Sequence, residues 1–441
     1  MIVVFVLVAV AVLALLAGVH RYLWRRLIGD TTKKHGLARR VGTVAAFALP
    51  LLTVGAFVSS RSGVPFPVQQ ALAWPGYLWL AALLYLTLAL LVGEAVRPLL
   101  RRVLARRSQE AGQPTATGGR HPDPAPDTAP APDPAAGQVD QAAPVAGAGS
   151  TRTDVAARPA AAPPVDDPSR RLFVARAVGG AAALAGLGTV GYGTYGVLRG
   201  PRTKRITIPL AGLPRSAHGF RIAVVSDIHL GPILGRAHTR RVVDAINATS
   251  PDLVAVVGDL VDGSVADLGS AAEPLAQLDA RHGSYFVTGN HEYFSGAAEW
   301  VDHVRELGLH PLENARVEIA GFDLAGVNDI AGESEGQGPD FARALGDRDR
   351  SRASVLLAHQ PVVIDDAVEY GVGLQLSGHT HGGQLWPGNL VAELANPTVA
   401  GYERYGDTQL YVSRGAGAWG PPVRVGAPSD ITVVQLASPQ A

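Results

Sequence analysis

Three long runs without charged side chains stand out in the first hundred residues of the chain. They are rich in Val, Leu and Ala and cover residues 2–19, 41–58 and 76–93. As a helix, each is long enough to cross the hydrocarbon core of a bilayer. The second contains Pro50, which a membrane helix tolerates. The alternative for the first run, a cleavable signal peptide, lacks basic residues before it and a small-residue cleavage site after it. We therefore predict a three-helix membrane region over residues 1–107.

Basic residues are distributed unevenly among the connections between these runs. Seven follow the first run, Arg61 alone lies between the second and third, and five follow the third. Lys and Arg are enriched on the cytoplasmic side of membrane proteins. The first connection and the segment from Arg97 onward are therefore predicted to be cytoplasmic, with the N-terminus outside.

Residues 108–168 are rich in Pro, Ala, Gly and Asp and contain almost no large apolar side chains. Such a segment cannot bury enough surface to offset the entropy of ordering it. We predict a disordered linker without chemistry of its own.

Residues 169–199 contain Arg170 and Arg171, followed by a glycine-rich and mildly apolar run. This pattern resembles a twin-arginine export signal, which would make the export machinery a partner. A fourth membrane helix is the alternative, and the two are compatible because either places the rest of the chain outside the cytoplasm. The basic residues between Arg199 and Arg205 weaken this charge bias, and they also form a candidate interfacial anchor or site for anionic headgroups.

Short apolar runs bounded by Gly, Pro, Asp and Asn alternate with helix-like stretches throughout residues 200–441. This alternation is typical of a layered α/β domain with a buried sheet. Strands are expected at 220–225, 253–257, 285–287, 322–327, 353–358, 372–376, 409–413 and 430–436, and helices at 236–248, 271–280 and 297–307.

Composition narrows the chemistry that this domain can perform. The formal net charge is zero, so no global basic field predicts a specific nucleic-acid partner. The chain has no cysteine, which excludes disulfides, thiolate metal sites and cysteine nucleophiles. Any metal ion must therefore be held by nitrogen and oxygen ligands.

Five clusters of such ligands follow five of the expected strands. On extended backbone, residues i and i+2 point the same way, which suits the pair His379 and His381. Each cluster alone has an ordinary interpretation as a turn, a helix cap or a surface pair. Their joint occurrence, each after a strand, predicts one site at an edge of the sheet. The clusters are Asp227-Ile-His229, Gly258-Asp-Leu-Val-Asp262, Gly289-Asn-His-Glu292, His359-Gln-Pro361 and Gly378-His-Thr-His381. The domain's other histidines are expected to be surface or packing residues: His218, His238, His282, His303 and His310.

In this order the clusters resemble the signature of the calcineurin-like metallophosphoesterase superfamily: Asp-X-His, Gly-Asp-X-X-Asp, Gly-Asn-His-Asp/Glu, a lone His and Gly-His-X-His. The resemblance covers residues 206–436. The glycine-flanked last motif and the preceding membrane segments look most like the bacterial membrane-associated branch. Some members of that branch are similar to enzymes that hydrolyse the pyrophosphate of UDP-diacylglucosamine. The resemblance implies an α/β fold, a layered β-sandwich flanked by helices, preceded by transmembrane helices.

The resemblance also implies two divalent metal ions about 3.5–4 Å apart, for which Mn, Fe and Zn are candidates. In the family pattern one carboxylate bridges the two ions, and this role falls to Asp259. Asp227, His229 and His381 would complete the first site, and Asn290, His359 and His379 the second.

The same resemblance implies a metal-bridging hydroxide as the nucleophile on phosphorus. His291 lies outside the metal set and would protonate the departing oxygen. Asp262 would hold the His291 ring and favour its charged form. Glu292 would support the same turn.

Two functions remain open at this point. The first is a phosphoesterase at the outer face of the cell membrane, multi-pass, with an extracytoplasmic catalytic domain. Its substrate would be a phosphoester or a pyrophosphate, either lipid-linked or, alternatively, a soluble nucleotide or nucleic acid. The second is a catalytically silent membrane sensor or scaffold that retains the fold. The complete set of ligands favours the enzyme.

Overall fold

The computed structural model describes residues 2–111, 168–319 and 321–441. The chain separates into two units, one formed by Met1–Glu94 with Ala175–Ala441 and the other by Ala95–Val174. The predicted linker at residues 108–168 belongs to the second unit, and its residues 112–167 lie outside the described residues.

Helices form at all four apolar runs of the sequence. They are α1 (Ile2–Leu23), α2 (Leu37–Ser59), α3 (Phe66–Ala111) and α4 (Pro168–Leu198), and α1 continues into a short π-helical segment, η1 (Trp24–Gly29). In the described part of the chain, these four helices are long and apolar enough to cross a membrane. Pro50 lies inside α2, as expected for a membrane helix that tolerates proline.

Helices α2 and α3 form a closely packed hairpin. A side-chain carbon at Gly76 of α3 would lie 2.6 Å from the carbonyl oxygen of Leu52, so only glycine allows the two backbones to approach this closely. At the same level, the hydroxyl of Thr53 donates a hydrogen bond to the carbonyl of Gly76 at 2.8 Å. These contacts hold α2 against α3, and the turn that joins the two helices contains Arg61.

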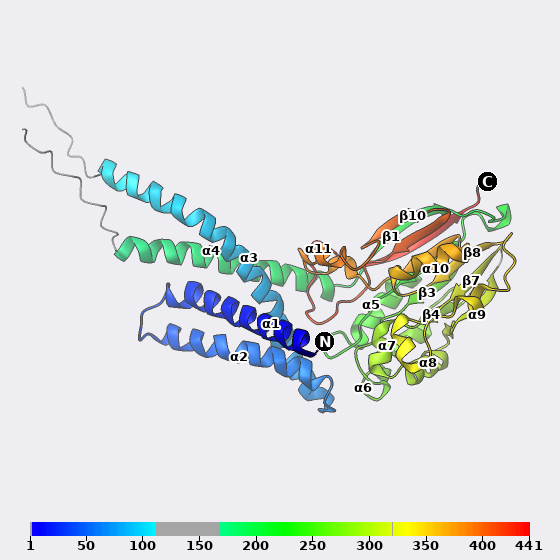
Figure 1. The fold of residues 1–441 in the computed structure, drawn as a ribbon, viewed down its shortest axis with the longest axis horizontal. Helices are drawn as coiled ribbons and strands as arrows, with labels where there is room; N and C mark the ends of the chain where they lie inside the picture. Colours follow the sequence, from blue (N-terminus) through cyan, green and yellow to red (C-terminus); the bar gives the residue numbers. More distant parts are fainter. Residues whose placement is uncertain (1, 112–167, 320) are drawn as a thin grey trace, which may run out of the picture. The chain divides into compact units, whose positions relative to one another are not determined.

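The region after α4 contains two six-stranded sheets, which can be followed in Figure 1. The first has the order β1-β12-β2-β3-β4-β5 and the second β10-β11-β9-β8-β7-β6. Strands β2, β3, β4 and β5 are parallel to one another, as are β7, β8, β9 and β11. The first sheet comprises β1 (Arg202–Pro209), β2 (Arg221–Val225), β3 (Leu253–Val257), β4 (Ser284–Val287), β5 (His310–Pro311) and β12 (Asp430–Ala437). The second comprises β6 (Ala315–Ile319), β7 (Phe322–Gly326), β8 (Ala353–Leu357), β9 (Leu374–Ser377), β10 (Gly401–Tyr405) and β11 (Thr408–Val412).

Apolar side chains of both sheets form the central core. Alternate residues of the inner strands, such as Val224, Ala255, Leu324 and Val355, pack together between the sheets. The intervening residues of the first sheet pack against α5 (Arg236–Asn247), α6 (Val265–Ala272) and α8 (Ala297–Glu306). Those of the second pack against α9 (Phe341–Leu345) and α10 (Ile364–Glu369). The domain is therefore a β-sandwich flanked by helices, as expected.

One predicted helix is displaced in the structure. Residues 271–280 were expected to be helical, but α6 begins at Val265 and ends at Ala272, followed by a 3-10 segment, η3 (Glu273–Gln277). The early start has a local cause, because the Ser264 side chain accepts a hydrogen bond from the backbone N–H of Asp267 at 3.3 Å. Pro274 then cannot donate to the helical hydrogen-bond ladder.

The basic segment at the start of the domain has a structural role that the sequence did not predict. Residues 202–209 form the edge strand β1, which pairs in parallel with β12. Lys204 forms an ion pair with Asp430, whose side chain is buried. At least this lysine therefore contributes to the sheet and not only to an interfacial anchor.

His238 is buried in α5 and gives the fold a pH dependence. Its ring is 1 % exposed, and neither ring nitrogen has a hydrogen-bond partner among the described residues. Burial, and then the charges of Arg241 and Arg424, lowers the pKa of His238 to about 3. In the unfolded chain a histidine titrates near pH ~6.5. The stability that depends on the neutral ring is therefore fully present above that pH and is lost as the pH falls toward 3.

We expect protonation of His238 to lower the free energy of unfolding of the full chain by about 2 kcal/mol as the pH falls from about 6.5 to about 4.5. His238→Leu removes the titrating ring and leaves no polar group unpaired, so its melting temperature in detergent should fall less over this range. His310→Leu, at an exposed position, is the matched control and should behave as wild type. Parallel pH dependences for His238→Leu and wild type would contradict the assignment.

Candidate metal centre

All nine predicted metal ligands and catalytic residues lie just beyond the ends of strands. Three of the strands, β2, β3 and β4, belong to the first sheet, and two, β8 and β9, belong to the second. The sequence placed the site at one edge of a sheet, whereas two adjoining sheet edges supply it. Asp227 and His229 follow β2, Asp259 and Asp262 follow β3, Asn290 and His291 begin α7 (Asn290–Ser295) after β4, His359 follows β8, and His379 and His381 follow β9.

Unusual backbone conformations aim these side chains. Of the eight described non-glycine residues with positive φ, five belong to the site: Asp227, His229, Asp259, His379 and His381. L-residues rarely adopt this region, and where it is maintained the surrounding structure must compensate for the strain. The sequence argument assumed that His379 and His381 lie on extended backbone and point the same way. They do not lie on extended backbone, and their side chains contact different partners.

The first group of ligands surrounds one end of the site. Nε2 of His229 lies 3.0 Å from Nε2 of His381 and 4.0 Å from Oδ1 of Asp227. Nε2 of His381 lies 3.4 Å from the same Asp227 oxygen. All three residues are buried. Their ligand atoms lie within 4.8 Å of one another, which is close enough to bind one cation.

The second group lies on the other side of Asp259. Nε2 of His359 is 3.1 Å from Oδ2 of Asp259, and the ligand atoms of Asp259, His359 and His379 again lie within 4.8 Å of one another. Asn290 joins this group because its Oδ1 is 3.0 Å from Nδ1 of His379. The Asp259 oxygen is also 3.7 Å from Nε2 of His229 in the first group. Asp259 therefore lies between the two groups.

Hydrogen bonding to His359 indicates that a cation fits between these groups. Its Nδ1 is 2.9 Å from the carbonyl oxygen of Val257, and because a carbonyl only accepts, Nδ1 carries the proton. Nε2 is buried and faces Oδ2 of Asp259 at 3.1 Å. The raised pKa of His359 means that this nitrogen holds a proton next to the carboxylate, and a bound cation would take the place of that proton. Two facing electron-pair donors in a buried site are satisfied by a cation between them, and nitrogen and oxygen ligands suit Mn, Fe and Zn.

Asp262 contacts two histidine rings at once. Its Oδ1 is 2.9 Å from Nδ1 of His229 and 2.7 Å from Nδ1 of His291. The two rings are nearly perpendicular, with centroids 4.8 Å apart. Burial raises the pKa of the Asp262 carboxyl, but the adjacent histidines outweigh it and lower this pKa to about 2. Asp262 is therefore a carboxylate that orients both rings, while Nε2 of His291 remains available to another partner.

Glu292 holds the loops around the site together. Its buried carboxylate accepts hydrogen bonds from the backbone N–H groups of Gly289 at 2.6 Å, Asp259 at 2.9 Å and Leu260 at 2.8 Å. These bonds join the loop after β3 to the loop after β4. The sequence suggested that Glu292 supports its own turn, and the structure extends this role to the loop of Asp259.

Arg424 orients the ring of His381 through contacts on the side away from its ligand atom Nε2. Its guanidinium donates to the carbonyl of His381 at 3.0 Å and lies 3.0 Å from Nδ1 of the same ring. The backbone N–H of Arg424 donates to Gly193 of α4 at 3.3 Å, so this arginine links α4 to the site. Burial, His229 and Arg424 together lower the pKa of His381 well below its usual value. His381 is thereby kept neutral, the form in which imidazole binds metals.

The remaining pKa shifts reflect competition between buried charges of opposite sign. Burial raises the pKa of Asp259, but His359 and His229 outweigh it, so the pKa is lowered overall. Burial lowers the pKa of His359, but Asp259 outweighs it and the pKa is raised well above its usual value. The pKa of His379 falls to about 4 because it is buried beside His359. The charged form of Asp259 is thus stabilised by the positive charge close to it.

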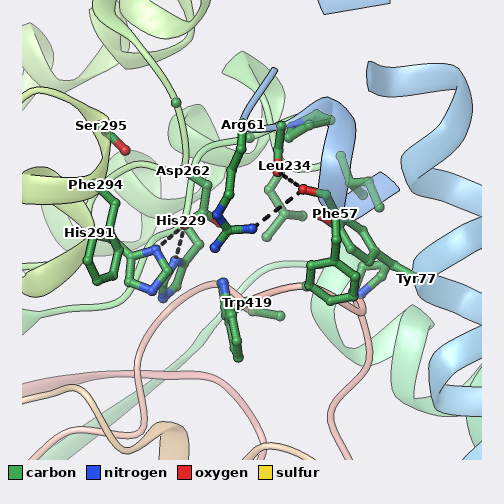
Figure 2. A pocket seen from close by; sticks show the side chains of 18 residues that line it. Phe57, Arg61, Tyr77, His229, Leu234, Asp262, His291, Phe294, Ser295 and Trp419 are labelled. Carbon is green, nitrogen blue, oxygen red and sulfur yellow. Dashed lines mark hydrogen bonds and ion pairs between the residues drawn. The ribbon is translucent and has the colours of Figure 1, made fainter. Parts of the chain in front are cut away.

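A cavity of about 100 Å³ adjoins His229, Asp262 and His291. The opposite wall consists of Phe57, Ser60, Arg61 and Tyr77 from the α2–α3 hairpin, and Phe294 and Trp419 also line the cavity. Figure 2 shows the guanidinium of Arg61 between the His229–His291 pair on one side and Phe57 on the other.

Several residues around the site were not predicted from the sequence. Arg61 was considered only for its charge, and Trp419 was not considered. Arg424 lies outside every ligand motif, so no sequence signal identifies it. A weak signal existed for Trp419, because the segment Gly415-Ala-Gly-Ala-Trp-Gly420 follows strand β11 as a glycine-rich loop. A side-chain carbon at Gly417 would lie 2.0 Å from the carbonyl oxygen of Ile228, so this loop packs directly on the Asp227 turn. None of the five histidines expected to be surface or packing residues belongs to a ligand group in the described chain.

The sequence model of the calcineurin-like phosphoesterase family matches residues 220–383 of the chain. The chain is similar to the transmembrane protein with metallophosphoesterase domain of Danio rerio, with 38 % identity over 259 residues, 56 % of this chain and 59 % of that protein. An uncharacterized metallophosphoesterase of Helicobacter pylori strain J99 is 38 % identical over 256 residues, 57 % of this chain and 68 % of that protein.

A third relative, an uncharacterized metallophosphoesterase of Bacillus subtilis, is 30 % identical over 289 residues, 61 % of this chain and 98 % of that protein. The match therefore spans less than two thirds of the zebrafish protein but nearly all of the Bacillus protein. Together with the ligand groups around Asp259, these matches show that the chain belongs to the calcineurin-like phosphoesterase family.

Proposed function

We propose that the chain is a metal-dependent phosphoesterase of the cell membrane that hydrolyses a phosphoester or a pyrophosphate. The observation that carries this proposal is the convergence of ligands from five strand ends on both sides of Asp259. Their chemistry, carboxylate, imidazole and amide oxygen, suits divalent cations. Membership of the calcineurin-like phosphoesterase family supports the same activity.

In this proposal two cations bind on either side of Asp259. Asp227, His229 and His381 would hold one cation and Asn290, His359 and His379 the other, and Asp259 would contribute to both. When bound, the cations supply positive charge that neutralises phosphoryl oxygens and lowers the pKa of a nearby water.

The protein's own residues then complete the hydrolysis. Water attacks phosphorus, a new P–O bond forms, and the P–O bond to the leaving group breaks. His291 gives a proton to the leaving oxygen, and the proton of the water passes to solvent. Asp262 supports this step, because its contact with Nδ1 at 2.7 Å directs the opposite ring nitrogen of His291 toward the cavity.

In this proposal the catalytic domain lies on the outer side of the membrane. The α2–α3 turn lines the same cavity as His291, so the turn and the domain share one side. The connection after α1, rich in Lys and Arg, lies at the other end of these helices, and such connections are typically cytoplasmic. Arg170 and Arg171, at the start of α4, keep the twin-arginine export route within this proposal.

Chelation of the full chain in detergent is expected to abolish hydrolysis of bis(p-nitrophenyl) phosphate and p-nitrophenyl phosphate. Adding Mn²⁺ back should restore it, because the ligand groups need cations to activate water. The same assay on intact cells, with a membrane-impermeant phosphoester, tests the outer placement. Metal-loaded protein that hydrolyses neither ester, nor a pyrophosphate such as UDP-glucose, would favour the silent sensor or scaffold.

A further inference from the structure

The wall of the cavity opposite His291 is supplied by the membrane hairpin. Phe57 and Arg61 lie at the end of α2 and in the following turn, and Tyr77 lies in α3. The rings of Phe57 and Tyr77 pack edge to face with centroids 5.1 Å apart. The close contact at Gly76 packs α2 against α3 beside Phe57 and Tyr77.

Arg61 is poised to bind an anion in this cavity. It is the only Arg or Lys among the described residues that line the cavity, and it has no carboxylate partner in the described part of the chain. Within the described parts of the chain, its guanidinium donates only to the Phe57 carbonyl, at a long 3.5 Å. An arginine with most of its five N–H groups free, beside a proposed phosphoesterase centre, suits a phosphoryl group.

Aromatic side chains provide the apolar part of the same cavity. Phe294 is 71 % exposed and Trp419 is 48 % exposed, although both are large apolar residues. Their rings lie 5.5 Å and 5.7 Å from the His291 ring, edge to face. With Phe57 and Tyr77, they surround the place where the leaving or retained ester group would lie. Exposed aromatic side chains around the positively charged Arg61 guanidinium are typical of a site for an amphipathic ligand.

We infer that the α2–α3 turn is part of the substrate site and that the substrate is a phosphoester carrying a long apolar chain. Arg61 binds an anionic oxygen of the phosphoryl group, and the apolar chain lies against Phe57, Tyr77, Phe294 and Trp419. Because α2 and α3 are long and apolar enough to cross a membrane, the cavity lies where a lipid phosphoester would approach from the bilayer. This inference rests on the proposed phosphoesterase activity.

A chain-length series tests the substrate class. The probes are p-nitrophenyl methyl phosphate and p-nitrophenyl dodecyl phosphate, which share the bond that breaks and the released p-nitrophenolate. With the full metal-loaded chain in nanodiscs, kcat/KM should be at least about 10-fold higher for the dodecyl ester, because the aromatic wall binds its chain. Phe57→Ala and Trp419→Ala should each reduce this preference several-fold. A preference that persists unchanged in both variants would reflect partitioning into the bilayer and would overturn the inference.

Substitution of Arg61 tests the anion contact. Arg61→Ala should raise KM about 10- to 100-fold with kcat within a few-fold of wild type, and Arg61→Lys should restore part of the affinity. Arg404→Ala is the matched control, because Arg404 is also exposed beside a turn and donates only locally, to Gly406 at 3.2 Å. An unchanged KM in Arg61→Ala would overturn the anion contact while leaving the proposed function intact. Failure of the wild-type chain to hydrolyse either ester would instead count against the proposed function itself.

Discussion

Asp259→Asn is expected to reduce kcat/KM for phosphoester hydrolysis at least about 10³-fold, equivalent to about 4 kcal/mol of lost transition-state stabilisation. The reason is position: Oδ2 of Asp259 lies 3.1 Å from Nε2 of His359 and 3.7 Å from Nε2 of His229, one histidine from each group. Asparagine has nearly the same shape, so its side-chain oxygen can still accept the hydrogen bond that the backbone N–H of His291 donates to Oδ1 of Asp259 at 2.9 Å. What is lost is the negative charge between the two groups.

Two measurements check this expectation, hydrolysis rate and bound metal per chain. Both should fall together in Asp259→Asn. Asp365→Asn provides the control, since Asp365 is exposed on α10 and belongs to none of the ligand groups. Wild-type metal content and turnover in Asp259→Asn would show that Asp259 does not link two metal sites.

His291→Ala is expected to lower kcat about 10²- to 10⁴-fold while leaving the metal content nearly unchanged. The ring contacts Asp262 through Nδ1 and faces the cavity, which suits proton donation to a leaving oxygen. The loss should be larger for esters of poorly acidic alcohols than for p-nitrophenyl esters, because p-nitrophenolate leaves without a proton.

The geometry also gives His291 a competing role. Its ligand atom lies within 4.8 Å of those of His229 and Asp259, so these three residues form a third possible ligand group. If His291→Ala loses metal together with activity, His291 is a ligand and not the acid. His310→Ala, at an exposed histidine outside the ligand groups, should retain both properties.

Much of the fold was readable from the sequence because its inner strands are apolar. Strands β3 and β8 are buried along their full length; β3 is an uninterrupted apolar run, and β8 is apolar except for Ser354. The edge strands β1 and β10 carry no such pattern, because most of their side chains are exposed. Edge strands form by pairing with a neighbour, and that neighbour is distant in sequence for β1, which pairs with β12.

The ligands were readable for a related reason. Each follows a buried strand, so chain order alone placed all nine near sheet edges. The residues that complete the site were not readable, because they reach it from elsewhere in the fold. Arg424 approaches His381 from a loop without a ligand motif, and Arg61 approaches His291 from a helix hairpin more than two hundred residues away. Such residues reach the site through tertiary packing, which no local sequence pattern reveals.

Anomalous diffraction from crystals of the full chain, collected across the Mn, Fe and Zn absorption edges, measures directly whether these ligands hold a pair of cations around Asp259. We expect two peaks about 3.5–4 Å apart, one beside Asp227, His229 and His381 and the other beside Asn290, His359 and His379. A metal-loaded, active chain that shows no peak beside Asp259, or a single peak remote from these side chains, would contradict the account.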